Sequence, residues 1–203
     1  MSKKKFLVVV DYQYDFFNPN GALYVNGGEK LQEKIEAIIP DFHHVTFTQD
    51  WHPLDHCSFV ENGGQWPTHC VAGTIGAGIP LSMIKLAKTY GYLIKGEDWN
   101  HEEYGAFNEK DDLAIEIDYL YDFVDAAGEF DTLDEINDKV LASDFEIVVC
   151  GIAGDYCVLE TLKNIVKHVG TDKVSVYLDG VVSIDGGVAL TNYMNENNIK
   201  VYK

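Results

Sequence analysis

Cys157 has the sequence context of a nucleophile. It follows an apolar run and a turn with two glycines, within Val148-Val-Cys-Gly-Ile-Ala-Gly-Asp-Tyr-Cys, and it begins a stretch with helical spacing. A thiol at the start of a helix lies among unpaired N–H groups and at the positive end of the helix dipole, and both favour the thiolate. The same turn can direct the backbone N–H groups of Ala153 and Cys157 at a developing oxyanion. Cys150, in contrast, closes an apolar run and is predicted to be a buried, unreactive thiol.

Asp11 and Lys95 complete a set of groups for nucleophilic catalysis. Each directly follows a short apolar run that predicts a strand. A lysine can stabilise a thiolate, and an aspartate can carry a proton between the thiol and a leaving group. Taken singly, a surface lysine and a turn aspartate are the commoner interpretations. Their arrival at the same edge of a sheet favours the catalytic interpretation.

Three of the seven histidines fall in one short stretch after another apolar run. Asp50 and His52 are one residue apart, so both can reach a metal ion from an extended segment, and His69 can complete the site from a later loop. His56 and Glu61 are candidates for further ligands. Carboxylate and imidazole together suit zinc, iron or manganese. The alternative is a loop whose polar side chains hold the backbone by hydrogen bonds.

The elements that must position these groups alternate along the chain. Short β-branched or aromatic runs predict strands at Phe6–Val10, His44–Phe47, Tyr92–Ile94, Glu146–Cys150, Lys173–Leu178 and Lys200–Tyr202. Helical spacing predicts helices at Glu29–Ile39, Pro80–Thr89, Thr132–Ala142, Asp155–Val169 and Asp185–Glu196. This alternation predicts a three-layer α/β fold, with helices on both faces of a parallel sheet. Such sheets bind ligands outside the carboxyl ends of their strands, where the candidate residues would meet.

Length and composition predict a single domain spanning residues 1–203, because 46% hydrophobic residues can form a sizeable core. The chain has 15 Lys and Arg against 33 Asp and Glu, a net charge of −18 that argues against a nucleic-acid partner. Three lysines and five apolar residues precede Asp11, which is too short a run for a signal peptide or a membrane span. We therefore expect a cytoplasmic protein with no membrane partner and with its four cysteines reduced.

One segment differs from the rest of the chain in composition. Residues 109–138 are dense in acidic side chains and also carry aromatic ones. This mixture predicts an inserted helical lid or a surface for homo-oligomer formation, in preference to a disordered tail.

Four blocks of the sequence resemble the nicotinamidase/pyrazinamidase branch of the isochorismatase-like cysteine hydrolases. The blocks are Val10-Asp-Tyr-Gln-Tyr-Asp-Phe-Phe, Thr48-Gln-Asp-Trp-His-Pro, Trp66-Pro-Thr-His-Cys-Val-Ala-Gly-Thr with Gly76-Ala, and Gly151-Ile-Ala-Gly-Asp-Tyr-Cys-Val. Their order and spacing cover nearly the whole chain. The resemblance implies the isochorismatase-like hydrolase fold, with a six-stranded parallel sheet, and a cis peptide bond before Ala153.

The resemblance also implies roles for particular residues. It places the catalytic triad at Asp11, Lys95 and Cys157, the metal ligands at Asp50, His52 and His69, and the substrate-binding aromatics at Phe16, Trp66 and Tyr104. It favours His56 over Glu61 as a fourth ligand. The implied cofactor is one divalent metal ion, zinc ahead of iron or manganese. The implied substrate is a small aromatic amide, nicotinamide and also pyrazinamide, converted to the acid and ammonia through a thioester in the salvage of NAD.

The chain departs from the family after Lys95. The stretch Gly-Glu-Asp-Trp-Asn-His-Glu-Glu-Tyr-Gly-Ala-Phe keeps only its last four residues in common with the family's substrate loop. One alternative is therefore another amide or carbamoyl hydrolase of the superfamily, although such relatives generally lack the Asp-x-His and His set. A second alternative is a catalytically silent metal-binding scaffold, and retention of all three triad residues argues against it.

Overall fold

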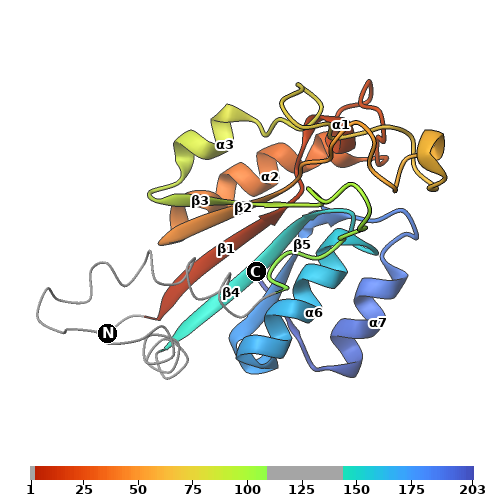
Figure 1. The fold of residues 1–203 in the computed structure, drawn as a ribbon. Helices are drawn as coiled ribbons and strands as arrows, with labels where there is room; N and C mark the ends of the chain where they lie inside the picture. Colours follow the sequence, from red (N-terminus) through yellow and green to blue (C-terminus); the bar gives the residue numbers. More distant parts are fainter. Residues whose placement is uncertain (1–2, 109–143) are drawn as a thin grey trace, which may run out of the picture.

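The computed structural model describes residues 3–108 and 144–203 and contains one six-stranded sheet (Figure 1). The strands are β1 (Lys4–Val10), β2 (His44–Asp50), β3 (Tyr90–Lys95), β4 (Phe145–Ile152), β5 (Val174–Val182) and β6 (Lys200–Val201). They lie in the order β3-β2-β1-β4-β5-β6, and every neighbouring pair is parallel. The predicted six-stranded parallel sheet is confirmed.

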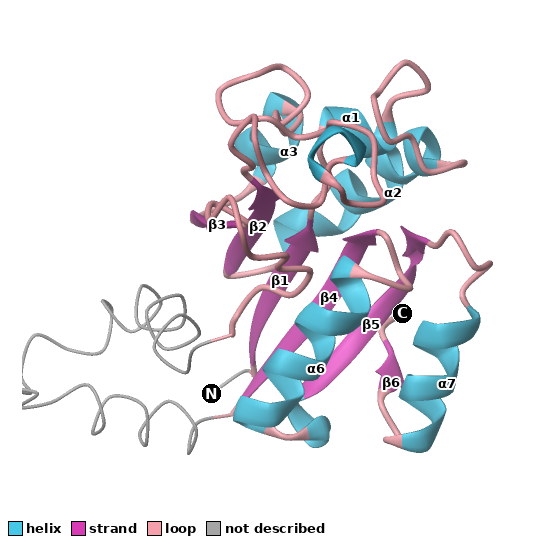
Figure 2. Cartoon of the chain, turned by 45° about the vertical axis from the view of Figure 1, so that its right-hand side comes forward, coloured by secondary structure: helices cyan, strands magenta, loops and turns pink. Residues whose placement is uncertain are grey.

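Helices cover both faces of this sheet, as Figures 1 and 2 show. One face carries α1 (Tyr14–Phe17), α2 (Leu31–Ile38) and α3 (Leu81–Leu86), and the other carries α6 (Cys157–Val169) and α7 (Val188–Glu196). Short 3-10 turns lie at Gly28–Lys30, Ile39–Asp41, Val60–Asn62 and Thr171–Lys173. The architecture is the predicted three-layer α/β arrangement.

The alternating side chains of β1 explain why the sheet is covered twice. Leu7 and Val9 pack into the core beneath α2, while Phe6, Val8 and Val10 pack into the core beneath α6. Successive side chains of a strand point to opposite faces, so a strand that is apolar throughout needs a layer on each side. The central strand therefore specifies three layers.

The observed helices are shorter than their predicted ranges. The last helix begins at Val188, whereas Asp185 lies before it and accepts hydrogen bonds from the N–H groups of Gly187 and Ala189. A carboxylate that binds the free N–H groups at a helix start lies outside the helix itself. The predicted helix at Thr132–Ala142 and the acidic segment 109–138 fall outside the described residues. The lid or oligomer role of that segment stays a prediction.

Within residues 3–108 and 144–203, no helix is both long and apolar enough to cross a bilayer. The carboxyl ends of β1, β2, β3 and β4 lie along one edge of the sheet (Figure 2). Gly151 near the end of β4 has a φ of +127°, and a Cβ there would lie 2.0 Å from the carbonyl oxygen of Val10. Glycine thus permits β4 to approach β1 closely just before the chain turns toward Cys157.

Candidate active site

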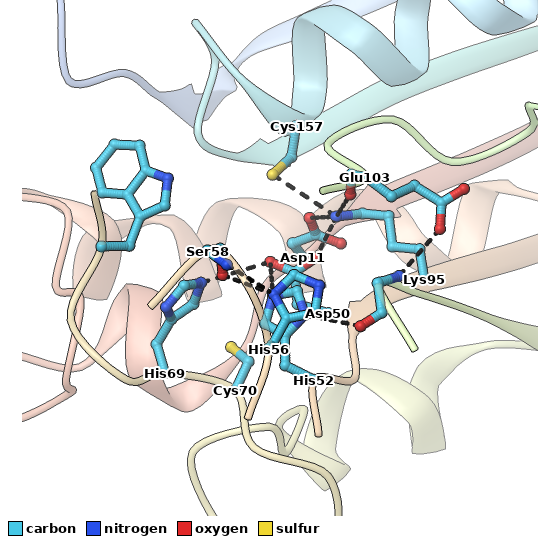
Figure 3. Close-up of polar contacts among 12 residues, drawn as sticks. Asp11, Asp50, His52, His56, Ser58, His69, Cys70, Lys95, Glu103 and Cys157 are labelled. Atoms are coloured by element: carbon cyan, nitrogen blue, oxygen red, sulfur yellow. Dashed lines mark hydrogen bonds and ion pairs between the residues drawn. The ribbon is translucent and has the colours of Figure 1, made fainter. Parts of the chain in front are cut away.

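The carboxyl ends of four neighbouring strands bring four reactive side chains together (Figure 3). Asp11 follows β1, Asp50 ends β2, Lys95 ends β3, and Cys157 is the first residue of α6 after β4. All four are buried, with exposed fractions of 0, 4, 3 and 6% in that order. The sequence prediction that these residues meet at the carboxyl edge of the sheet agrees with this arrangement.

Lys95 lies at the centre of the group. Its Nζ is 2.9 Å from Asp11 Oδ2 and 3.8 Å from Cys157 Sγ, and it also contacts Asp50 Oδ1. Burial opposes the positive charge of Lys95, but the two carboxylates and the thiol outweigh burial and raise its pKa well above the usual value. Lys95 therefore carries a positive charge among acidic partners.

Asp11 and Cys157 both hold their protons more strongly than exposed groups do. Burial raises the pKa of the Asp11 carboxyl, although Lys95 acts to lower it. Burial also raises the pKa of the Cys157 thiol well above its usual value, again against the influence of Lys95. The helix start had predicted a thiolate, and desolvation in the folded chain reverses that expectation. The thiol needs a base in reach, and an oxygen of Asp11 lies within 4.8 Å of its sulfur.

The turn before Cys157 contains the two backbone N–H groups of the predicted oxyanion hole. The peptide bond between Ile152 and Ala153 is cis, which confirms the expectation drawn from the family resemblance. The Ala153 carbonyl accepts hydrogen bonds from the N–H groups of Tyr156 and Val158. Among the described residues, no acceptor is bonded to the N–H of Ala153 or of Cys157. These two groups are free to bind a ligand oxygen, and their catalytic role stays a prediction.

Asp50, His52 and His69 form a buried cluster that fits a divalent metal ion. One potential ligand atom from each lies within 4.8 Å of the others. His52 Nδ1 lies 2.9 Å from the carbonyl oxygen of Gly96, and His69 Nδ1 lies 2.7 Å from that of Pro67. A carbonyl only accepts, so each Nδ1 carries a hydrogen, and Nε2 of each ring is the atom that faces Asp50 and is placed to bind a metal ion. The Nε2 atoms of His52 and His69 lie 3.6 and 4.0 Å from Asp50 Oδ2.

The charges in this cluster depend on Asp50. Burial disfavours its carboxylate, but Lys95 and the two histidines outweigh burial and hold the pKa of Asp50 below the usual value. Burial likewise opposes a charge on His52, yet Asp50 raises the pKa of His52, whereas burial lowers the pKa of His69. The cluster therefore presents an ionised carboxylate to two imidazoles, which is a donor set that zinc and similar ions accept.

Gly96 lies directly after Lys95 and packs against His52 of the metal cluster. Its φ is +68°, and a Cβ there would lie 2.5 Å from the ring of His52. Its carbonyl is also the acceptor for His52 Nδ1. Only glycine lets the chain leave Lys95 and place its backbone this close to the imidazole.

The two candidates for a fourth ligand do not join this cluster. His56 uses both ring nitrogens, with Nδ1 2.8 Å from Ser58 Oγ and Nε2 3.0 Å from the His101 carbonyl oxygen. Its ring stacks on that of His52 at a centroid distance of 4.1 Å. Glu61 is exposed and accepts a hydrogen bond from Thr68. A fourth protein ligand stays a prediction.

Gln13 holds Asp50 through its backbone. The Gln13 side chain donates from Nε2 to the carbonyl oxygens of Asp50, at 2.8 Å, and Ala77, at 3.0 Å. Its Oε1 accepts from the Asp50 N–H at 2.8 Å. Gln13 is fully buried, so these bonds satisfy its whole amide against the loop beside the cluster. No sequence pattern indicated this role, although Gln13 lies in the first of the four family blocks.

One pocket connects the thiol with the metal cluster. Its wall is formed by Phe16, Leu23, Val25, Asp50, Trp66, His69, Glu102, Tyr104, Ala153, Tyr156, Cys157 and Ile184. The predicted aromatic residues Phe16, Trp66 and Tyr104 are all in this set, and Trp66 Nε1 donates to the Tyr104 hydroxyl at 3.1 Å.

Sequence reasoning missed other parts of the wall. Leu23, Val25 and Ile184 come from irregular loops, which carry no periodic signal. Glu102 lies in the loop that carries Tyr104, and Tyr156 directly precedes Cys157. Their closeness in sequence to these predicted site residues is the one signal that could have indicated a place in the pocket wall. A mostly apolar and aromatic pocket with a few polar groups is typical of a site for a small molecule.

Comparisons with known proteins agree with this geometry. No protein-family model matches the chain. A nicotinamidase/pyrazinamidase of Mycobacterium tuberculosis is 31% identical over 207 residues, and the match covers 96% of each chain. This match therefore extends over both the triad residues and the metal cluster.

Solved structures resemble the whole fold. The pyrazinamidase of Pyrococcus horikoshii in complex with zinc has a TM-score of 0.75 and 29% identity, covering 98% of this chain and 99% of its own. PnC1 from L. infantum in complex with nicotinate also has a TM-score of 0.75 and 29% identity, covering 100% and 94%. An isochorismatase-like hydrolase from Alkaliphilus metalliredigens, at 18% identity and a TM-score of 0.67, covering 98% and 94%, shares the fold.

Proposed function

The chain belongs to the nicotinamidase/pyrazinamidase branch of the isochorismatase-like cysteine hydrolases, and on this premise we propose that it deamidates nicotinamide through a thioester on Cys157. The observation that carries the proposal is one pocket that joins a buried thiol, lysine and aspartate to a carboxylate–histidine cluster. Nicotinate and ammonia are the products. Pyrazinamide, a similar aromatic amide, is the proposed second substrate.

In the first half of the reaction, Cys157 Sγ bonds to the carboxamide carbon while Asp11 takes the thiol proton. Lys95 stabilises the negative charge that develops beside it, and the N–H groups of Ala153 and Cys157 bind the oxyanion. The C–N bond then breaks, and the proton held by Asp11 leaves with the nitrogen as ammonia. The acyl group remains on the sulfur as a thioester.

In the second half, water attacks the thioester carbon while Asp11 takes a proton from the water. The C–S bond breaks, and Asp11 returns the proton to the sulfur. The product acid leaves and gives its remaining proton to solvent as nicotinate, and the resting thiol is restored. The raised pKa values of Asp11 and Cys157 suit this scheme, because the thiol is protonated at rest and the carboxylate is a stronger base than an exposed one.

Asp50, His52 and His69 would hold the metal ion, with zinc proposed ahead of iron or manganese. When bound, the ion supplies a Lewis acid to which a pyridine nitrogen can bind. Phe16 and Trp66 would enclose the aromatic ring, with Tyr104 fixing Trp66 through its hydroxyl. These contacts orient the carboxamide toward Cys157 and favour an aromatic amide over a carbamoyl substrate.

An ammonia-release assay on nicotinamide, with and without a chelator, tests this function. We expect release by the untreated protein, loss of release after chelation, and recovery on addition of zinc. Ammonia release that the chelator leaves unchanged would contradict the role of the metal cluster. Faster turnover of an N-carbamoyl amino acid than of nicotinamide would favour the carbamoyl-hydrolase alternative.

A further inference from the structure

Thr48 is a buried hydroxyl that lies directly against Asp11 and has no part in the scheme above. It belongs to β2, and its side chain is fully buried. The Thr48 hydroxyl donates to Asp11 Oδ1 at 2.6 Å. The Asp11 backbone N–H donates in turn to the Thr48 hydroxyl oxygen and to the Thr48 carbonyl oxygen, each at 3.2 Å. One side chain thus binds both the carboxylate and the backbone of the proposed base.

The other carboxylate oxygen of Asp11, Oδ2, lies beside Lys95. Asp11 Oδ2 is buried, and among the described residues no hydrogen-bond donor of good geometry is directed at it. Its neighbour is the charged Nζ of Lys95 at 2.9 Å, with which it forms an ion pair. Oδ2 therefore has the ammonium group of Lys95 as its partner, whereas Oδ1 has the hydroxyl of Thr48.

The backbone of Asp11 also needs an anchor. Its φ is +45°, in the left-handed region that side-chain-bearing residues seldom adopt. The bonds from its N–H to Thr48 hold this conformation at the point where the chain leaves β1. Without them, both the backbone and the carboxylate would gain freedom to rotate.

We propose that Thr48 is a positioning residue that engages Asp11 Oδ1 so that Oδ2 alone faces Lys95 and the thiol as the proton-transferring atom. This inference rests on the proposed amidohydrolase function. It assigns distinct tasks to the two oxygens of one carboxylate, because a hydroxyl that donates to Oδ1 fixes the plane of the group.

Replacement by valine and by serine separates positioning from packing. Thr48→Val keeps the shape of the side chain but leaves Oδ1 buried without its donor, whereas Thr48→Ser keeps the hydroxyl. For nicotinamide we expect kcat of T48V to fall about 10- to 100-fold, since positioned acid–base groups contribute on this scale. We expect KM and bound zinc to stay within about twofold, because the hydroxyl binds Asp11 and not a cluster ligand. T48S should keep kcat within about fivefold of the parent value, because it retains the donor.

Ser175 offers a matched control at the other end of the sheet. Its buried hydroxyl donates to Glu146 Oε1 at 2.8 Å, so it also joins neighbouring strands through a hydroxyl–carboxylate bond. Ser175→Ala should lower the thermal midpoint but leave kcat unchanged. Comparing T48V with S175A therefore distinguishes a catalytic effect from the general cost of losing a buried hydroxyl.

The proposal is overturned if T48V keeps the parent kcat, if it loses zinc together with kcat, or if T48S is as impaired as T48V. Should T48V fail to fold, Thr48→Cys takes its place in the comparison with T48S. The S–H group of the cysteine is only a weak donor, so kcat of T48C should fall below that of T48S. An unaltered protein that releases no ammonia would contradict the proposed function itself, whereas an active parent with an equally active T48V would contradict the role of Thr48 alone.

Discussion

The two halves of the pocket are assembled in different ways. The metal cluster takes its three residues from one short stretch, and backbone carbonyls orient both of its histidines. Asp11, Lys95 and Cys157 come from three separate strand ends, and their mutual charges and hydrogen bonds hold them in place. Asp50 belongs to both halves, because its Oδ1 contacts Lys95 and its Oδ2 faces the histidines (Figure 3).

This difference teaches which properties each half controls. Imidazoles fixed by carbonyl acceptors are preorganised for a cation, so the cluster should set metal affinity and ring binding. In the triad half the charged side chains contact one another, and Lys95 Nζ also donates to the Glu103 carbonyl oxygen at 3.3 Å, so the chemistry depends on burial and on partner residues such as Thr48. Substitutions confined to one half should therefore change one property and spare the other.

The largest expected effect is that of Cys157→Ala. Removal of the nucleophile should lower kcat on nicotinamide by at least about 10⁴-fold, because covalent catalysis loses its acceptor. Bound zinc should stay at the parent level, since the sulfur lies on the triad side of the pocket. Ammonia assays and metal analysis of the purified variant test both parts. Undiminished ammonia release would refute the thioester scheme.

His52→Ala should produce the reverse pattern. Loss of an imidazole ligand should weaken zinc affinity by more than about 100-fold, because even outer partners of a metal ligand contribute 10- to 100-fold. The rate at which iodoacetamide alkylates Cys157, followed by mass spectrometry of its peptide, should change by less than about threefold, since that substitution leaves the pair of Cys157 and Lys95 intact. A large change in alkylation would show that the two halves are not separable.

Gly96→Ala perturbs the junction between the halves. Its Cβ would strike the ring of His52, so zinc affinity should fall about 10- to 100-fold, the usual scale for disturbing an outer partner. Gly186→Ala is the matched control, because Gly186 has a similar φ of +76° and no atom within 4 Å of an added Cβ. Competition with a chromophoric chelator gives both affinities. Equal losses in the two variants would assign the effect to backbone strain instead of to His52.

Trp66→Phe should give the smallest effect. It keeps an aromatic wall but loses the hydrogen bond to Tyr104, so KM for nicotinamide should rise about fivefold, the scale of one ordinary hydrogen bond. We expect kcat and bound zinc to stay at parent values. Steady-state kinetics with direct metal analysis measure all three quantities, and a fall in kcat with KM unchanged would place Trp66 on the catalytic side instead.

The sequence alone determined the layered fold and most of the reactive groups. Apolar runs mark the strands, and the residue after each run is the one that a parallel sheet presents at its carboxyl edge, so Asp11 and Lys95 could be selected from their positions. The metal cluster could be predicted because Asp50, His52 and His69 are close along the chain. Local patterns of this kind do not depend on knowing which strands are neighbours.

Only the tertiary structure decided how these groups act. The pairing of β1 with both β2 and β4 places Asp11 between Thr48 and Cys157, and no local pattern specifies that order. Burial in the folded chain raises the pKa of Cys157, whereas its position at a helix start had indicated a thiolate. Strand order and desolvation arise from contacts between residues far apart in sequence, and for this reason they were decided by the fold.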